Sequence, residues 1–235
     1  MSTLIHPQLP LGFEPGELYT FDSFVVGENT VAAALAQQTA LGLGEKQMYF
    51  WGEQGLGKSH LLQACCNLAA KNNRTVCYLT PAEISNQSAD MFDGLEQINL
   101  ICLDDIETWL VSDIWETALF NLINRVREAN QCLLLSSAKT PDDAFVQLPD
   151  LRSRLSWGPI FQMHSLSDKE KYQALKYRAK QNGLELPENV ADYLMQRYPR
   201  DMFGLFERLA VLDKASMAMQ RRLTIPLVKS VFAEE

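Results

Sequence analysis

The stretch Gly52-Glu-Gln-Gly-Leu-Gly-Lys-Ser59 decides the fold of this chain. It matches the pattern G-x-x-x-x-G-K-[ST], in which glycines let the backbone turn so that successive N–H groups face phosphate oxygens. An apolar run at residues 47–51 precedes it and predicts a strand, and residues 58–71 have helical spacing. A strand before the motif and a helix after it are the context that phosphate binding requires. We therefore predict a nucleoside phosphate site with Mg²⁺.

Each residue type of this loop has a role in such a site. Lys58 would reach the β- and γ-phosphates, and the hydroxyl of Ser59 would bind Mg²⁺. The start of the following helix adds positive partial charge. Phe24 and Val25 either line the base or belong to the core, and His60 suits a packing role better than catalysis. The loop residues that we expect at the nucleotide are Gln54, Gly55, Leu56, Gly57, Lys58, Ser59 and His60.

Strand and helix patterns alternate on both sides of the loop. Further strands are predicted at residues 75–80, 98–103, 131–137 and 159–163, with a helix at 115–129. This alternation predicts an α/β fold with a five-stranded parallel sheet covered by helices. Beyond residue 167 only helical patterns follow, at 168–181, 188–197 and 201–220, which predict a small all-α domain. We expect a flexible tail at 1–20, an α/β domain at 21–165 and a helical domain at 166–235.

Composition limits the classes of function. The net charge is −8, so gripping the DNA backbone is not expected to be the main activity, and DNA would be reached indirectly through a partner. The apolar runs are shorter than a bilayer span, and the first residues lack the pattern of a signal peptide. The five cysteines have no C-x-x-C spacing. We expect a cytoplasmic protein with no membrane segment.

Two predicted strands end in polar residues. The run at 98–103 is followed by Asp104 and Asp105, and the run at 131–137 ends in Ser136 and Ser137. Ligands of open α/β sheets bind at the carboxyl ends of strands. Asp104 would hold Mg²⁺ through water, and Asp105 could orient or activate the attacking water; a helix cap or a solvated loop pair is the alternative. Ser137 is a candidate nucleotide sensor, although hydroxyls that cap the next turn are equally expected.

Arg152 and Arg154 lie two residues apart on a short predicted helix, so they point to different faces. One could pair locally with Asp150 while the other projects outward. An outward arginine just before the last strand could complete the active site of a neighbouring molecule and stabilise transition-state charge there. An ordinary surface arginine is the alternative.

This order of features resembles an AAA+ ATPase, and most closely the nucleotide-binding module of the bacterial replication initiator DnaA. The resemblance extends from about residue 20 to the C-terminus. It rests on the segments Phe21-Asp-Ser-Phe-Val-Val-Gly-Glu-Asn29, Gly55-Leu-Gly-Lys-Ser-His-Leu-Leu62, Leu103-Asp-Asp-Ile106 and Ser153-Arg-Leu-Ser-Trp-Gly158. The helical domain would be the lid of the module. We expect no DNA-binding domain of the kind found in initiators after it.

The tail contains Gln8-Leu9-Pro10-Leu11-Gly12-Phe13, which resembles peptides bound by the replicative sliding clamp. In such peptides glutamine fills a polar pocket and apolar residues enter a groove. The residues expected at the clamp are Gln8, Leu9, Leu11 and Phe13. An extended tail with prolines suits this docking, because it has little ordering entropy left to lose.

Together these features resemble the DnaA-related regulators that inactivate the initiator after replication starts. The resemblance implies partners, namely DnaA, the DNA polymerase III sliding clamp and further copies of this chain. It also implies that Arg154 enters the site of DnaA–ATP and promotes hydrolysis there. The chain's own ADP or ATP, most readily a diphosphate, with Mg²⁺, would then set its shape more than act as a fuel.

Two departures from the family pattern predict slow intrinsic ATP hydrolysis. A lid arginine that senses phosphates is replaced by Phe203, unless Arg200 substitutes from one turn earlier. Asp105 is also shorter than the glutamate common in AAA+ enzymes. Whether the chain is itself an enzyme is therefore left open.

Three other functions compete with regulation of DnaA. An ATP-driven loader for replication or transposition would need self-assembly and DNA contact, which the acidic charge disfavours. A metabolic kinase would need an inserted acceptor lid, which the sequence lacks. A clamp-binding adaptor with a vestigial site would retain no nucleotide.

Overall fold

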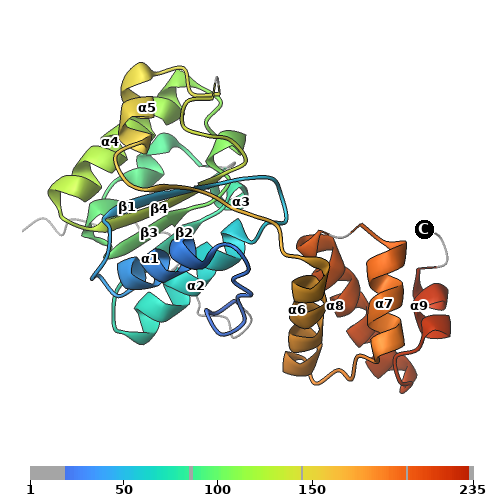
Figure 1. The fold of residues 1–235 in the computed structure, drawn as a ribbon. Coiled ribbons are helices and arrows are strands. Elements are labelled where there is room, and N and C mark those ends of the chain that lie inside the picture. Colours follow the sequence, from blue (N-terminus) through green and yellow to red (C-terminus); the bar gives the residue numbers. More distant parts are fainter. Residues whose placement is uncertain (1–18, 85–86, 144, 200, 233–235) are drawn as a thin grey trace, which may run out of the picture. The chain divides into compact units, whose positions relative to one another are not determined.

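The computed structural model describes residues 19–84, 87–143, 145–199 and 201–232, and these form two compact units (Figure 1). The first unit comprises residues 19–21, 29–53 and 58–163. The second comprises residues 22–28, 54–57 and 164–232. The phosphate-binding loop thus contributes to both units.

A five-stranded sheet forms the centre of the first unit. Its strands are β1 (Gln47–Trp51), β2 (Val76–Leu79), β3 (Leu100–Leu103), β4 (Cys132–Ser137) and β5 (Ile160–Gln162). Every pairing is parallel, and the order across the sheet is β2-β3-β4-β1-β5. The α/β fold with five parallel strands predicted from the sequence is confirmed. Because β1 lies between β4 and β5, the phosphate-binding loop leaves the sheet from an interior strand.

Helices cover both faces of this sheet (Figure 1). On one face lie α1 (Thr30–Ala40) and α2 (Lys58–Lys71), and on the other lie α4 (Asp113–Glu128) and α5 (Pro149–Leu155). Shorter turns are α3 (Pro81–Ile84), η1 (Ala89–Phe92), η2 (Leu95–Gln97) and η3 (Ile106–Thr108). The helix α1 was not predicted, because its sequence TVAAALAQQTA has little contrast between apolar and polar faces.

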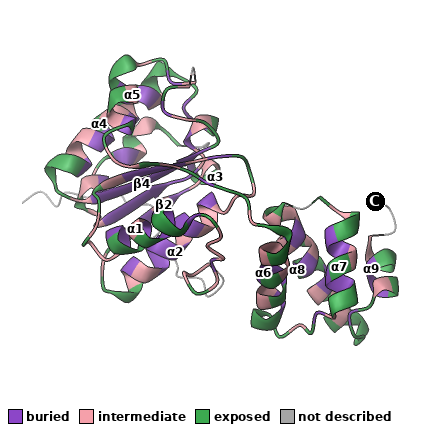
Figure 2. Cartoon of the chain, viewed as in Figure 1, coloured by how far each residue is buried: buried purple, intermediate pink, exposed green. Residues whose placement is uncertain are grey.

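Alternation along the strands divides the buried side chains between two layers. Figure 2 shows that the central strands of the sheet are buried. Tyr49, Ile101 and Leu133 point to the same layer as Leu119 and other residues of α4, in one buried cluster. Their neighbours along the strands point to the α2 layer, where the sulfurs of Cys66 and Cys102 lie 3.4 Å apart. This double coverage explains why the strands read as continuous apolar runs.

The second unit contains four helices in the described residues, α6 (Asp168–Gln181), α7 (Glu188–Arg197), α8 (Met202–Met219) and α9 (Ile225–Val231). Ser167 and Glu170 form a capping box that fixes the start of α6. Leucines from three helices meet in its core, namely Leu175, Leu194, Leu205 and Leu209. The seven-residue α9 is too short for a periodic signal and was not predicted. None of the helices in the described part of the chain is long and apolar enough to span a membrane.

Candidate nucleotide-binding site

The loop from Gly52 to Gly57 joins β1 to α2. Gly55 and Gly57 have φ angles of 82° and 89°, a left-handed conformation that favours glycine. Lys58 is buried, and its ammonium donates to the carbonyl oxygens of Gly52 at 2.7 Å and Glu53 at 3.0 Å. The loop therefore has the backbone turn and the held cation that a phosphate cradle requires, and the residues present fit a nucleotide.

Phe24 lies next to this loop. A Cβ atom on Gly57 would be 3.2 Å from Cε2 of Phe24, and both residues belong to the second unit. Phe24 is buried and Val25 is half-buried. This placement suits a ring that lines the nucleotide and a ring that packs in the core, so both interpretations of Phe24 stay predictions.

Asp104 follows β3 and is only 3% exposed. Its Oδ2 accepts a hydrogen bond of 2.6 Å from the hydroxyl of Tyr78, and its Oδ1 accepts one from the hydroxyl of Ser136. An ionised carboxylate offers about four lone-pair sites, so two remain for a water or a cation. The chemistry of Asp104 and of the Ser59 hydroxyl therefore fits the Mg²⁺ that we expect them to hold.

Asp105 has a different environment from its neighbour. Its φ angle is 43°, its backbone N–H donates to Oγ of Ser136 at 2.9 Å, and its carboxylate lies 4.0 Å from the ammonium of Lys58. Burial and the charge of Asp104 raise the pKa of Asp105 to about 6, while Lys58 opposes the rise. A carboxyl with a pKa near neutrality suits a proton acceptor beside the phosphates.

Ser137 and His60 have structural partners. The carbonyl of Ser137 accepts from the N–H of Gly52 at 3.1 Å, and its hydroxyl accepts from the N–H of Lys139 at 3.0 Å. The hydroxyl thus caps the turn after β4, which was the alternative to a sensor role. Nε2 of His60 lies 3.2 Å from the carbonyl of Thr20, and the ring packs edge-on against Tyr19. These contacts agree with a packing role for His60.

Tyr78 was not predicted to belong to the site, and Ser136 was given no role separate from that of Ser137. Both side chains hold Asp104, and Tyr78 also accepts from Nε2 of Gln63 at 3.2 Å. The available signal was a hydroxyl-bearing residue near the end of two apolar strands, Tyr78 in β2 and Ser136 in β4. Which acid it would contact could not be inferred without the strand order.

Arg154 lies on α5, and its guanidinium is held in place. Its Nε donates to Oδ1 of Asn124 at 3.0 Å, and its Cζ lies 3.8 Å from the ring centroid of Trp157. Arg152 donates instead to the carbonyl of Val146, at 2.9 and 2.5 Å. The expected pairing of one arginine with Asp150 is therefore replaced by a bond to the backbone, while the two arginines do point to different partners.

The backbone of Arg154 is anchored at the start of β1. Nε2 of Gln47 donates to the carbonyls of Arg154 at 2.7 Å and Leu155 at 3.2 Å. Gln47 is the first residue of β1, whereas Gly52 follows its last residue. Five residues of strand span roughly 17 Å at about 3.3 Å each. The Arg154 backbone thus lies at the opposite end of β1 from the chain's own phosphate-binding loop.

Some of the predicted site residues lie outside the part of the chain that the structure describes. Phe203 is 56% exposed on α8, and Arg200 lies outside the described residues. The predicted clamp-binding residues, Gln8, Leu9, Leu11 and Phe13, also lie outside the described residues.

A parallel sheet with a phosphate-binding loop after β1, acids after β3 and a helical C-terminal unit defines a P-loop AAA+ module. Residues 16–162 match the family model of the bacterial DnaA ATPase domain, and residues 168–232 match the lid domain of Hda. An uncharacterized protein of Haemophilus influenzae is 40% identical over 97% of this chain and 99% of its own. The chain belongs to the bacterial DnaA ATPase family and is an Hda-like member of it.

Solved structures agree with this fold. Domain III of the Thermotoga maritima initiation protein DnaA has a TM-score of 0.80 at 19% identity, covering 94% of this chain and 98% of that one. AMPPCP-bound DnaA from Aquifex aeolicus has a TM-score of 0.68 at 23% identity, covering 88% and 69%. The Thermotoga maritima Holliday junction motor RuvB has 0.67 at 16%, covering 92% and 71%.

Membership of the family indicates a class of ligand and a cellular process. DnaA-like AAA+ domains bind ATP or ADP, and the family acts in the initiation of DNA replication. The family therefore indicates an ATP- or ADP-binding protein with a role in replication initiation.

Proposed function

We propose that this chain inactivates DnaA by stimulating hydrolysis of the ATP that DnaA holds. Residues 1–20 would anchor the chain to the DNA-loaded sliding clamp through Gln8, Leu9, Leu11 and Phe13. Residues 21–165 would form the nucleotide-binding domain that packs against DnaA, and residues 166–235 the lid. The family supports a role in replication initiation, and the direction of that role, negative regulation, is our proposal.

The position of Arg154 carries the proposal. Its backbone is bonded to the first residue of β1, about 17 Å along the strand from the chain's own loop. A cation there is better placed for the nucleotide of a neighbouring molecule than for its own. An arginine supplied in trans stabilises the charge that develops on the transferred phosphoryl group and raises the rate by about 10³ to 10⁵.

The chain's own nucleotide would have a structural role. Gln54 to His60, with Phe24 and Val25, would contact it, Ser59 and Asp104 would hold Mg²⁺, and Ser137 and Arg200 would sense the phosphates. Mg²⁺ would supply charge neutralisation between phosphate oxygens. Asp105 is short and Phe203 replaces an arginine, so we expect slow intrinsic hydrolysis and stable binding of ADP.

The proposal is tested by loading DnaA with γ-labelled ATP and adding the chain together with clamp-loaded DNA. The wild-type chain should release labelled phosphate, and Arg154→Ala should reduce release to the rate of DnaA alone. Gln8→Ala should lose stimulation only at limiting concentration, because it weakens anchoring and leaves Arg154 intact. Arg221→Ala, at an exposed arginine after α8, is the matched control and should behave as wild type. If Arg154→Ala stimulates fully, the proposed function is wrong.

A further inference from the structure

A cavity of about 360 Å³ lies in the first unit, at the end of the sheet away from the phosphate-binding loop. It is bounded by the start of β1, the end of α4, the start of β4 and the segment after α5. Its apolar lining comes from Ile123, Val126 and Leu133, each at most 2% exposed, and from Trp157, which is 37% exposed. Its size is in the range of pockets that accept small ligands or single side chains.

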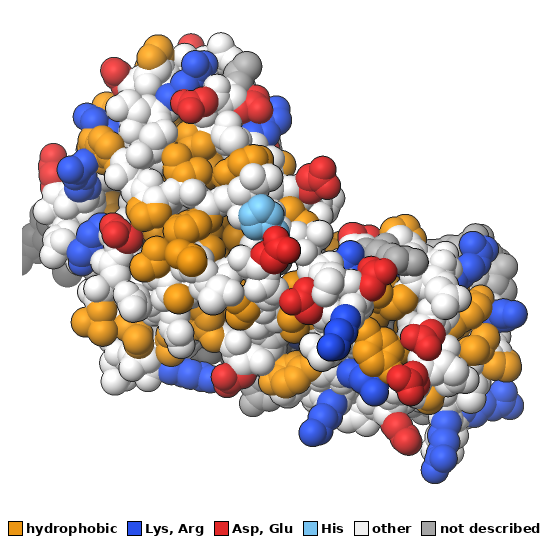
Figure 3. All heavy atoms as spheres, in the orientation of Figure 1, with side chains coloured by type: hydrophobic (Ala, Val, Ile, Leu, Met, Phe, Trp, Pro, Cys, Tyr) orange, Lys and Arg blue, Asp and Glu red, His pale blue; other side chains and the backbone are white. Residues whose placement is uncertain are grey.

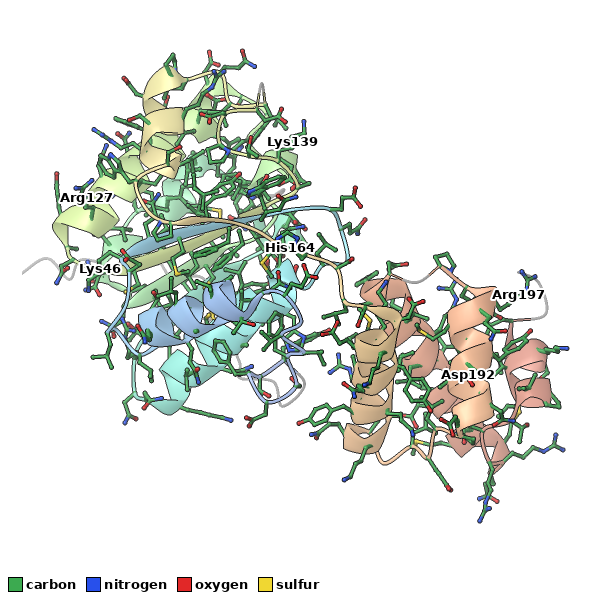
Figure 4. The ribbon with its side chains drawn as sticks, in the orientation of Figure 1. Lys46, Arg127, Lys139, His164, Asp192 and Arg197 are labelled. Atoms are coloured by element: carbon green, nitrogen blue, oxygen red, sulfur yellow. The ribbon has the colours of Figure 1, made fainter. Side chains whose placement is uncertain are left out.

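The rim of this cavity carries two cations and one acid. Lys46 and Arg127 both line it and are exposed, and Figure 4 shows them on the same side of this unit. The ammonium of Lys46 donates to the carbonyl of Asn130 at 3.1 Å. Glu45 is the acidic residue of the lining. Two cations against one carboxylate give the rim a small excess of positive charge, in a chain of net charge −8.

Trp157 links the cavity to Arg154. The guanidinium carbons of Arg127 and Arg154 each lie 3.8 Å from the centroid of its indole ring. Two guanidinium groups cannot share one face at that distance, so the indole lies between them. Trp157 lines the cavity and is 37% exposed. Trp157 therefore lies both at the cavity and against Arg154.

We propose that this cavity is a docking site for a segment of DnaA in which a carboxylate lies next to an apolar side chain. The apolar side chain would pack against the exposed part of Trp157, above the buried Ile123, Val126 and Leu133, and the carboxylate would pair with Lys46 and Arg127. This inference rests on the proposed function, because the cavity adjoins Arg154. Ile160, which follows Trp157 on β5, is also exposed, and Figure 3 shows further hydrophobic side chains on the surface of this unit.

A protein segment fits this cavity better than nucleic acid does. Nucleic-acid affinity depends on many cations that follow the phosphate backbone, and this rim has two beside an acid. An apolar floor also adds nothing to phosphate binding. A buried apolar anchor surrounded by charged groups is instead the usual arrangement of an energetically important protein contact.

The test uses the full-length chain and measures binding to ATP-loaded DnaA and hydrolysis at saturating chain. Lys46→Glu reverses a rim charge without touching the Trp157 stack, so it should weaken binding about tenfold or more and leave the saturated rate within about twofold. Lys71→Glu makes the same charge change at an exposed lysine, the last residue of α2, and should bind as wild type. Lys46→Ala, with its milder change, gives the readout if Lys46→Glu does not fold.

Wild-type affinity in both Lys46 variants would overturn the docking site, and so would a loss confined to DNA binding or to self-association. Failure of the proposed function is distinguished by Arg154→Ala. If Arg154→Ala stimulates hydrolysis of DnaA-bound ATP normally while Lys46→Glu binds DnaA weakly, the docking site is supported and the role of Arg154 in trans is wrong.

Discussion

Two adjacent carboxylates at the end of β3 are set apart by their surroundings. Asp104 is buried and accepts from two hydroxyl groups, whereas Asp105 is partly exposed and bonds only weakly to Lys58. Because burial and the charge of Asp104 raise the pKa of Asp105 to about 6, Asp105 can exchange protons near neutral pH. We assign cation binding to the first and proton chemistry to the second on this basis.

The raised pKa of Asp105 predicts a pH-dependent effect on stability. Its ordinary pKa is 3.8 and its folded value is about 6, so the folded state disfavours the ionised form. The contribution of Asp105 to the stability of the folded state is therefore fully present below about pH 4 and is lost as the pH rises through 6. Asp105→Asn removes this titration, and asparagine tolerates the left-handed backbone. The melting temperature of Asp105→Asn, relative to that of wild type, should therefore rise as the pH is raised from 4 to 7. Asp142→Asn, at an exposed position, is the control. If the curves of melting temperature against pH ran parallel for Asp105→Asn and wild type, the prediction would be contradicted.

Removal of the Tyr78 hydroxyl tests the support of Asp104. Tyr78→Phe leaves a buried carboxylate oxygen without its donor, which should cost about 1–3 kcal/mol of unfolding free energy. The matched control is Tyr177→Phe, whose hydroxyl only accepts an exposed bond from Gln181. Denaturant unfolding should detect a clear loss for the first and under about 0.5 kcal/mol for the second. Equal losses would mean that Tyr78 has no special role.

Among the elements, α5 depends most on its neighbours, because a seven-residue helix is not stable alone. At its start, Glu116 of α4 accepts from the backbone N–H groups of Gln147 at 2.8 Å and Leu148 at 2.6 Å. At its end, Gln47 of β1 donates to two carbonyls. Side chains from two other elements therefore fix the helix that carries Arg154.

A change at Glu116 should loosen α5. Glu116→Gln replaces one acceptor by an NH₂ group facing a backbone N–H, so it should cost about 1–3 kcal/mol of stability and lower Arg154-dependent stimulation. Glu128→Gln, at the exposed end of the same helix, should change neither by more than about 0.5 kcal/mol or twofold. Chemical unfolding and DnaA-bound ATP hydrolysis provide the two readouts. If Glu116→Gln lost stability but stimulated hydrolysis as wild type does, the support of α5 by Glu116 would not matter for stimulation.

The elements with strong local signals were predictable from the sequence. Strands β1 to β5, α2 and the helices α6 to α8 agree with the expected segments, because apolar runs and helical spacing are local properties. The partners that build the site are not local: Gln47 lies 107 residues from Arg154, and Tyr78 lies 26 from Asp104. Only the strand order brings these pairs together.

At the scale of the first unit, the sheet separates two functional ends. The phosphate-binding loop leaves the carboxyl end of β1, and the Arg154 backbone is bonded at its amino end. A module that has its nucleotide site at one end of the sheet and an arginine for a neighbour at the other end suits head-to-tail contact between modules. The predicted homo-oligomer and the contact with DnaA both follow this geometry and remain predictions.

This separation predicts that nucleotide binding is independent of Arg154. ADP with Mg²⁺ should stabilise the wild-type chain by about 2.7 kcal/mol at one hundred times its Kd. Lys58→Ala should lose most of this gain, and Arg154→Ala should keep it. Thermal unfolding with and without ADP measures the effect. A lost shift in Arg154→Ala would place this arginine at the chain's own nucleotide.

The most direct test of the account is a single-turnover measurement on ATP bound to DnaA, at saturating regulator. Arg154→Ala and Arg154→Lys should bind DnaA as wild type does, yet lower the stimulated rate about 100-fold or more, because neither offers the planar fork of guanidinium donors. A stimulated rate within about twofold of wild type for Arg154→Ala would contradict the claim that this chain completes the active site of its partner.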